Sequence, residues 1–300
     1  MYSSVVERCP DKTEVLGSIP STRTIYYLFL FFDSLAFKRQ RSLVRFQVHA
    51  QFIIYFYFLT LSHLMQKNLK NLIDQMIRLK KKDKAEHLGY FFKTGKGQYG
   101  EGDLFLGISV PKTRELIKDY THLDLKEISK LLSNKYHEIR LAGLLILVKK
   151  YQKGEGREKE KIFNFYLKNS KNINNWDLVD LSAYHIVGGY LFDKDRKVLE
   201  KLAQSNNLWQ KRIAIVSTFA FIKAGEYLPT FKIVEILMED RNDLIHKACG
   251  WMLREVGKKV SEEELKKFLD KWGTKMPRTM LRYSVERFDE KERLYYLNKK

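Results

Sequence analysis

Apolar residues recur at spacings of three and four along most of residues 65–300, which is the pattern of helices that bury one face. No segment alternates apolar and polar residues with a period of two over enough residues to indicate a sheet. Only five prolines interrupt the chain, which favours long helices over many short strands. The sequence therefore predicts an all-α fold. The clearest helical segments are HEIRLAGLLILVKKY, LWQKRIAIVSTFAFIKAG, LIHKACGWMLREVGKK and RTMLRYSVERF.

The predicted helices also repeat. A basic residue followed closely by alanine recurs at Arg140-x-Ala142, Arg212-x-Ala214 and Lys247-Ala248. These spacings fit two or three repeats of about 36 residues, each a helical hairpin, which is the period of helical solenoids. Stacked hairpins of this kind curve and form a concave groove. The glycine-rich stretch GKGQYGEGD lacks the residue order of a phosphate-binding loop, so we expect an interhelical loop there.

Residues 1–64 differ from the rest of the chain. Their apolar runs IYYLFLFF and FIIYFYFLTL are each shorter than the roughly 20 residues of a membrane-spanning helix. SSVVER and GSIP can be encoded by DNA that resembles the D-arm and T-arm of a transfer RNA gene, at the spacing of those arms. We expect residues 1–64 to be translated upstream DNA, disordered and not native, with the true start at Met65 and one domain over 65–300. A membrane-anchoring segment is the alternative.

Charge indicates the kind of partner. The chain carries 55 Lys and Arg against 36 Asp and Glu, a formal net charge of +19, and most of the excess lies after residue 64. A polyanion is the expected partner, with nucleic acid first and an anionic membrane second. Cys9 and Cys249 have no metal-ligand spacing. Cys249 lies in an apolar helical run, where we expect a reduced core thiol, and a cytoplasmic location fits. We therefore expect no metal and no cofactor.

The stretch INNWDLVDLSAYHIVGGYL places acids at the start of a predicted helix in this basic chain. Asn174 or Asn175 is a natural N-cap, and Asp177 in the first turn complements the helix dipole. Asp180 lies beyond the first turn, four residues after Trp176 and on the same face. Two interpretations of Asp180 remain open: a solvated surface carboxylate, or a functional carboxylate held against an aromatic wall.

Basic residues accompany two other tryptophans. Lys247, Trp251 and Arg254 follow one another along one face of a predicted helix. Cations interleaved with rings suit phosphates and bases, although a tryptophan that caps the core is the alternative. Lys211 and Arg212 stand at the start of another predicted helix, where their charges oppose the dipole and a phosphate would remove the conflict.

These residues carry a resemblance to a known family. The chain after residue 65 resembles the AlkD-like DNA alkylation repair enzymes, which are alkylpurine DNA glycosylases built of HEAT-like repeats. The resemblance implies an α-α superhelical solenoid with a concave basic groove. Four segments in this order carry it: YGEGDLFLGISVPKTREL (99–116), NNWDLVD (174–180), LWQKRIAIV (208–216) with KACGWMLREVGK (247–258), and MPRTMLRYSVERF (276–288).

The resemblance also implies roles for particular residues. The family's lesion-site aspartate falls on Asp180, its partner tryptophan on Trp176 and its second lesion-site tryptophan on Trp251. Its DNA-contacting arginine falls on Arg212. A tyrosine that faces the lesion falls only loosely on Tyr99.

The activity so implied is the excision of cationic N3- or N7-alkylated purines from duplex DNA, in base excision repair, by a monomer that leaves the lesion in the duplex. Asp180 would stabilise the positive charge that develops on the deoxyribose. Lys211, Lys247 and Arg254 would hold phosphates. Two other classes remain open: a DNA-structure-binding solenoid without catalysis, and a protein-binding HEAT scaffold.

Overall fold

The computed structural model describes residues 51, 53, 55 and 67–299. The chain divides into two compact units, Met1–His63 and Leu64–Lys300. The expected start at Met65, Cys9 and nearly all of the 1–64 segment lie outside the described residues, so the interpretation of that segment stays a prediction. In the part that is described, no helix combines the length and the apolar character that a membrane span requires.

The all-α prediction is confirmed for the described residues. Their only β-type pairing is an isolated bridge between Leu104 and Tyr136. The stretch 95–103 is a loop between α4 and α5, as predicted. The helices are α3 (Leu69–Arg78), α4 (Lys82–Phe91), α5 (Val110–Leu116), α6 (Leu125–Leu132), α7 (His137–Lys153), α8 (Gly156–Lys168), α9 (Trp176–Asp180), α10 (Lys197–Ala203), α11 (Leu208–Ser217), α12 (Phe219–Ile222), α13 (Leu228–Leu237), α14 (Asp243–Lys259), α15 (Glu262–Trp272), α16 (Arg278–Ser284) and α17 (Glu290–Asn298), with 3-10 turns at Ile117–Tyr120 and Ser170–Asn172 and the π-helical turn η3 (Tyr184–Gly188).

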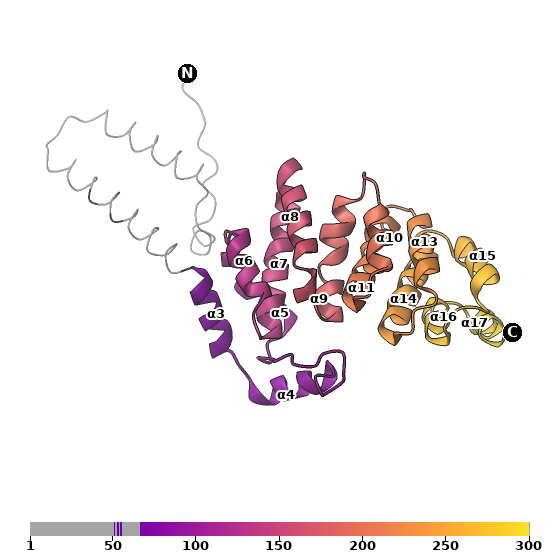
Figure 1. Cartoon of the computed structure of the whole chain (residues 1–300), viewed down its shortest axis with the longest axis horizontal. Coiled ribbons are helices and arrows are strands. Elements are labelled where there is room, and N and C mark those ends of the chain that lie inside the picture. Colours follow the sequence, from indigo (N-terminus) through magenta and orange to yellow (C-terminus); the bar gives the residue numbers. More distant parts are fainter. Residues whose placement is uncertain (1–50, 52, 54, 56–66, 300) are drawn as a thin grey trace, which may run out of the picture. The chain divides into compact units, whose positions relative to one another are not determined.

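Within residues 67–299 the helices form four successive hairpins (Figure 1). They are α6 with α7, α8 with α9 and η3, α10 with α11, and α13 with α14. The second helices of these hairpins contact one another in chain order, and α16 continues their row by packing on α14. We call α7, α9 with η3, α11, α14 and α16 the second-helix row. Its members start at His137, Trp176, Leu208, Asp243 and Arg278, close to the predicted period, but the sequence motif marked only three of them.

Asparagine side chains begin three members of the second-helix row. Asn175 accepts a hydrogen bond from the backbone N–H of Trp176, Asn207 from Trp209 and Gln210, and Asn242 from Leu244. Each cap satisfies helix-terminal N–H groups that would otherwise lack a partner. The predicted cap at 174 or 175 is therefore Asn175, and Asp177 lies in the first turn as expected.

The predicted continuous helix after Asn175 is instead broken into α9 and η3. α9 ends at Asp180, after five residues. Shortly afterwards the hydroxyl of Ser182 donates to the carbonyl of Leu178 at 2.5 Å and contacts the hydroxyl of Tyr166 at 2.8 Å. A hydroxyl that bonds back to its own helix competes with the backbone ladder and bends helices, and the π-helical turn begins at Tyr184. Asp180 therefore sits at a helix end.

The last two helices of the second-helix row, α14 and α16, pack unusually closely. Gly250 lies in α14, and a Cβ atom added there would come within 2.5 Å of both the carbonyl oxygen of Met280 and the Cβ of Tyr283 in α16. Real side chains do not approach so closely, so only glycine allows α14 and α16 to approach at this point.

We predict that Gly250→Ala lowers the free energy of unfolding by about 1–3 kcal/mol, because the new methyl group must push two backbones apart. The measurement is urea denaturation. Gly89→Ala in α4 is the matched control, since its nearest neighbour would be Thr94 Oγ1 at 3.4 Å, and it should be neutral or stabilising by up to about 1 kcal/mol. Equal stability of the two variants would contradict the close approach.

Candidate active site and nucleic-acid interface

A buried ion pair joins the end of α9 to α11. Arg212 Nε donates to Asp180 Oδ1 at 2.8 Å and Arg212 Nη2 donates to Asp180 Oδ2 at 2.7 Å. The remaining nitrogen of the guanidinium is also used, because Nη1 donates to the carbonyl of Leu244 in α14 at 2.7 Å. This bidentate geometry is the strong form of the arginine–carboxylate pair. Two of the residues predicted for the site therefore lie in direct contact.

The Asp180 carboxylate is neither a solvated surface acid nor a fully enclosed one. Its side chain is 16% exposed and that of Arg212 is 7% exposed. Burial raises the pKa of the Asp180 carboxyl above its ordinary value, and the charge of Arg212 and its hydrogen bonds oppose this rise. Arg212 is thus the neighbour that favours the ionised carboxylate, and the exposed edge is the part that a ligand can reach.

Trp176 lies against aromatic rings from α4 and the residue that follows it. It stacks on Phe92, with ring centroids 5.1 Å apart and an interplanar angle of 25°, and meets Phe91 edge-on at 6.0 Å. The ring is partly buried. Trp176 is therefore packed against rings at the end of α4, which the sequence did not indicate, and the aromatic wall beside Asp180 stays a prediction.

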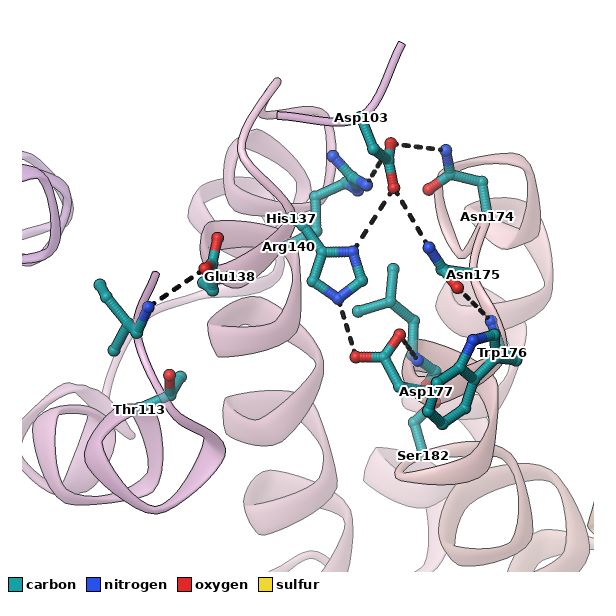
Figure 2. A network of polar contacts seen from close by, with 12 residues as sticks. Asp103, Thr113, His137, Glu138, Arg140, Asn174, Asn175, Trp176, Asp177 and Ser182 are labelled. Atoms are coloured by element: carbon teal, nitrogen blue, oxygen red, sulfur yellow. Dashed lines mark hydrogen bonds and ion pairs between the residues drawn. The ribbon is translucent and has the colours of Figure 1, made fainter. Parts of the chain in front are cut away.

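A second set of buried charges lies at the start of α9 (Figure 2). His137, the first residue of α7, stands between two carboxylates: Nε2 is 2.8 Å from Asp177 Oδ2 and Nδ1 is 3.4 Å from Asp103 Oδ2. Arg140 Nη2 donates to Asp103 Oδ1 at 2.7 Å. We call Asp103, His137, Arg140 and Asp177 the buried network. Asp177 therefore has a partner besides the helix dipole.

Asn174 and Asn175 extend the buried network from the residues before α9. Their side-chain amides donate to the Asp103 carboxylate at 3.2 and 3.5 Å. Glu138, which follows His137 in α7, accepts hydrogen bonds from the backbone N–H groups of residues 106–108. It therefore holds the segment that joins the loop at Asp103 to α5. The loop, α7 and α9 are thus joined by buried polar contacts.

Trp251 belongs to a row of rings and cations on η3, α12 and α14. It lies 6.2 Å from Phe219, which in turn meets Tyr184 edge-on at 5.4 Å. Lys223 Nζ lies 5.5 Å from the Tyr184 ring centroid and 5.7 Å from that of Phe219, and Lys259 Nζ lies 5.9 Å from Phe219. Trp251 packs against the core on one side and stays partly exposed. The core contact agrees with a tryptophan that caps the core, and its role at a nucleic-acid surface stays a prediction.

The predicted phosphate-binding cations already have carboxylate partners. Lys211 meets Asp240 at 2.5 Å, and Lys247 meets Asp243 one helical turn away at 2.8 Å. The third, Arg254, pairs with Glu286. Lys211 therefore does not face the helix dipole alone, and a phosphate would have to share or displace these partners.

A cluster of cations that the sequence analysis missed has no such partner. It consists of Arg114, Lys118, Lys149 and Lys153, from α5, the following turn and α7, and no described carboxylate lies within ion-pair distance of them. Burial lowers the pKa of Lys149, and the charges of the other three lower it further. We call these four residues the unpaired cation cluster. The sequence contains a signal, because KK (149–150) and KDY (118–120) follow apolar helical runs. Only the fold, however, brings these cations close to one another.

The unpaired cation cluster continues toward the aromatic row. Burial lowers the pKa of His185 in η3 to about 4, and the charges of Lys223 and Arg114 act in the same direction. The His185 ring lies 3.8 Å from that of Tyr184. Arg114 from α5 and Lys223, which follows α12, therefore lie near the rings of η3, an arrangement that suits a phosphate backbone with bases.

Tyr99 and Lys247 line one pocket. Its volume is about 370 Å³, and the Tyr99 ring meets Trp209 edge-on at 6.2 Å. The pocket adjoins the Arg212 site, because Leu244, whose carbonyl accepts from Arg212, also lines it. The full lining is Lys93, Tyr99, Arg241, Asn242, Asp243, Leu244 and Lys247.

Metal binding and thiol chemistry find little support in the described part of the chain. No group of three or more His, Cys, Asp and Glu residues there could hold a metal ion. Cys249 is free and lies buried in the core as part of α14. Burial raises the pKa of its thiol, so the nucleophilic thiolate is disfavoured.

Paired helices that carry buried ion pairs and a basic, aromatic row define an all-α protein of helical repeats. The chain belongs to the DNA alkylation repair enzyme family, whose family model matches residues 72–288. A solved structure described as a predicted DNA alkylation repair enzyme from Enterococcus faecalis is similar, with a TM-score of 0.55 and 14% identity. The similarity covers 70% of this chain and 97% of that one, and at this identity it shows the fold alone. No curated protein sequence matches the chain. The resemblance found in the sequence is thereby confirmed.

We predict that Arg212→Ala lowers the free energy of unfolding by about 3–5 kcal/mol, because it leaves the Asp180 carboxylate buried without its partner. Urea denaturation at pH 7 measures the loss. Lys247→Ala is the matched control, since Lys247 and Asp243 are 41% and 57% exposed, and it should change stability by no more than about 1 kcal/mol. Similar losses in the two variants would contradict the special role of the Asp180–Arg212 pair.

Proposed function

We propose that this protein is a DNA glycosylase that excises cationic N3- and N7-alkylated purines from duplex DNA. The observation that carries the proposal is the Asp180 carboxylate, which lies partly exposed at a helix end and accepts hydrogen bonds from Nε and Nη2 of Arg212. Membership in the DNA alkylation repair enzyme family supports a DNA substrate. We propose further that the protein acts as a monomer in the cytoplasm, in base excision repair.

The chemistry needs a fixed negative charge more than a strong acid. An alkylated purine is already cationic, so its glycosidic bond breaks without protonation of the base. Positive charge then develops on the deoxyribose, where a nearby carboxylate stabilises it and orients the attacking water. Arg212 fixes the Asp180 oxygens before the substrate arrives, so that little reorganisation remains for the reaction itself.

The tryptophans have a complementary role in this proposal. The faces of Trp176 and Trp251 would meet the cationic base or sugar, at about 0.5–2 kcal/mol per contact. The stack on Phe92 holds Trp176 in one orientation, and the contact with Phe219 does the same for Trp251. Tyr99 would approach from the neighbouring pocket.

Phosphate binding would use two kinds of cation. Arg212, Lys211, Lys247 and Arg254 would contact phosphates near the lesion while keeping their carboxylate partners. The unpaired cation cluster has no described partner to lose, so it should supply a larger share of the binding free energy. Each phosphate that such a cation neutralises releases counterions, which makes the affinity depend on salt.

A DNA-structure-binding protein without catalysis is the second candidate function. The complete pairing of Asp180 favours it, because a buried ion pair can have a purely structural role. A protein-binding scaffold is the third candidate, and the excess of Lys and Arg over Asp and Glu after residue 64 counts against it. Base release distinguishes the glycosylase from the non-catalytic DNA-binding protein. The dependence of DNA affinity on salt distinguishes both of these from a protein-binding scaffold.

We predict that Asp180→Asn lowers the rate of 7-methylguanine release from methylated duplex DNA by about 10²–10³-fold, because the amide removes the charge that stabilises the sugar cation. The assay is single-turnover base release, followed by chromatography. Binding of undamaged duplex should change little.

Asp195→Asn is the control for this prediction, since Asp195 is exposed in the loop before α10. It should keep the wild-type rate. An Asp180→Asn variant that releases 7-methylguanine at the wild-type rate, with unchanged DNA binding, would exclude the catalytic role and leave the second candidate function.

We predict that Lys149→Gln and Lys153→Gln each reduce the slope of log Kd against log salt for undamaged duplex by about 1, since each removes one phosphate contact. Fluorescence anisotropy over a range of salt concentrations gives the slopes. Lys161→Gln, at an exposed lysine of α8, should leave the slope unchanged. A wild-type affinity that does not depend on salt would favour the scaffold.

A further inference from the structure

The buried network is not used by the chemistry proposed above, and its geometry specifies a protonation state. Both ring nitrogens of His137 face carboxylate oxygens, Nε2 toward Asp177 and Nδ1 toward Asp103. A neutral imidazole carries one N–H, so one bare nitrogen would face a carboxylate oxygen in either tautomer. Only the imidazolium can donate on both sides.

Charge balance leads to the same state. The titratable and charged groups that face His137 are Asp103 from the loop, Asp177 from α9 and Arg140 from its own helix. Two ionised carboxylates and one guanidinium leave one negative charge unbalanced, and the imidazolium neutralises it. The side chains of His137, Arg140 and Asp103 are 2%, 6% and 5% exposed, and an unbalanced charge is costly at such depth.

The buried network is attached to the candidate site through α9. Asp177 is one residue after Trp176 and three before Asp180, within a helix of five residues. One turn is too short to be stable alone, so contacts made by its side chains must hold it in place. Arg212 holds its last residue, and His137 holds its second.

Aromatic stacking makes a second connection to the same side chain. Phe92 stacks on Trp176 and also lies 5.1 Å from the His137 ring. Phe105 stacks on His137 at 4.7 Å with an interplanar angle of 24°. A movement of the His137 ring would therefore reach Trp176 both through Asp177 and through Phe92.

We propose that His137 is a positioning residue: as an imidazolium bridging Asp103 and Asp177, it holds α9 so that Trp176 and Asp180 are set for the DNA, and its deprotonation at alkaline pH loosens that arrangement. The part of this inference that concerns base release rests on the proposed function. The part that concerns the protonation of His137 and the placement of Trp176 does not.

The direction of the pH effect follows from the surroundings of His137. Burial alone would lower its pKa, but the hydrogen bonds and charges of Asp103 and Asp177 raise it to about 9. The pKa in the unfolded chain is about 6.5, so the folded value is the higher one. The stability that His137 contributes is therefore fully present below pH 6.5 and is lost as the pH rises through about 9.

The first experiment uses the wild-type protein and needs no DNA. Nitrogen-15 NMR of the histidine rings should show both nitrogens of His137 protonated at pH 7, with deprotonation near pH 9. The indole N–H signal of Trp176, identified by its loss in Trp176→Phe, should shift over the same pH range. A His137 ring that is neutral at pH 7, or a Trp176 signal that does not follow it, would overturn the proposal.

The second experiment compares His137→Gln with His87→Gln, an exposed histidine of α4. His137→Gln should lower kcat for 7-methylguanine release by about 10²-fold, as expected for a displaced reacting group, with KM nearly unchanged. It should also remove the loss of unfolding free energy that the wild type shows between pH 6.5 and 9. His87→Gln should resemble the wild type in both respects.

The outcomes separate this inference from the proposed function. A wild type that releases no base from alkylated DNA refutes the glycosylase proposal, while the NMR titration still decides the role of His137. A catalytically active wild type whose His137→Gln variant keeps full kcat refutes the positioning role alone. If His137→Gln does not fold, Asp177→Asn takes its place, and the wild-type titration remains decisive.

Discussion

The Asp180–Arg212 pair is the interaction on which the candidate site depends. It connects three successive members of the second-helix row, because Arg212 in α11 donates to Asp180 at the end of α9 and to Leu244 in α14. A buried charge is tolerated only when it is paired and hydrogen-bonded. Replacing either residue alone leaves the other buried without its partner, and the contacts of Arg212 relate α9, α11 and α14 to one another at this level.

The same device occurs twice in the row. Arg140 in α7 pairs with Asp103 and donates to the carbonyl of Asn134, just as Arg212 pairs with Asp180 and donates to a carbonyl. The two pairs differ in what surrounds the carboxylate. Asp103 is 5% exposed and has further partners in His137 and two asparagines, whereas Asp180 is 16% exposed and has only Arg212. The same kind of pair is thus partly open to solvent at Asp180 and enclosed at Asp103.

The sequence was sufficient for those features that depend on local pattern. Helical periodicity predicts the all-α fold, and residue type limits the cap to Asn174 or Asn175, of which the structure uses Asn175. Trp176, Asp180 and Arg212 each stand at a position that the family resemblance marks, and the structure brings Asp180 and Arg212 into contact. The break after α9 was missed, because it depends on Ser182 bonding back to Leu178 while Tyr166 contacts the same hydroxyl.

The buried network and the ion-pair partners were beyond the reach of sequence patterns. Asp103, His137 and Asp177 come from a loop and two helices, and nothing in their local sequence relates them. Asp177 had a sufficient local explanation in the helix dipole, which concealed its contact with His137. Likewise, Lys211 reads as an unpaired cation until the fold brings Asp240 to within 2.5 Å of it.

The distribution of partners changes how the positive charge of this chain should be understood. The four cations predicted to bind phosphates stand near tryptophans or helix starts, and the structure pairs each of them with a carboxylate. They are Lys211, Arg212, Lys247 and Arg254. Such pairs order the site and leave little uncompensated charge beside Asp180. The unpaired cation cluster lies on other elements, where mutual repulsion remains until an anion arrives. In the function proposed above, attraction of a phosphate backbone and stabilisation of a sugar cation would make opposite electrostatic demands, and the separation of the two kinds of cation would satisfy both.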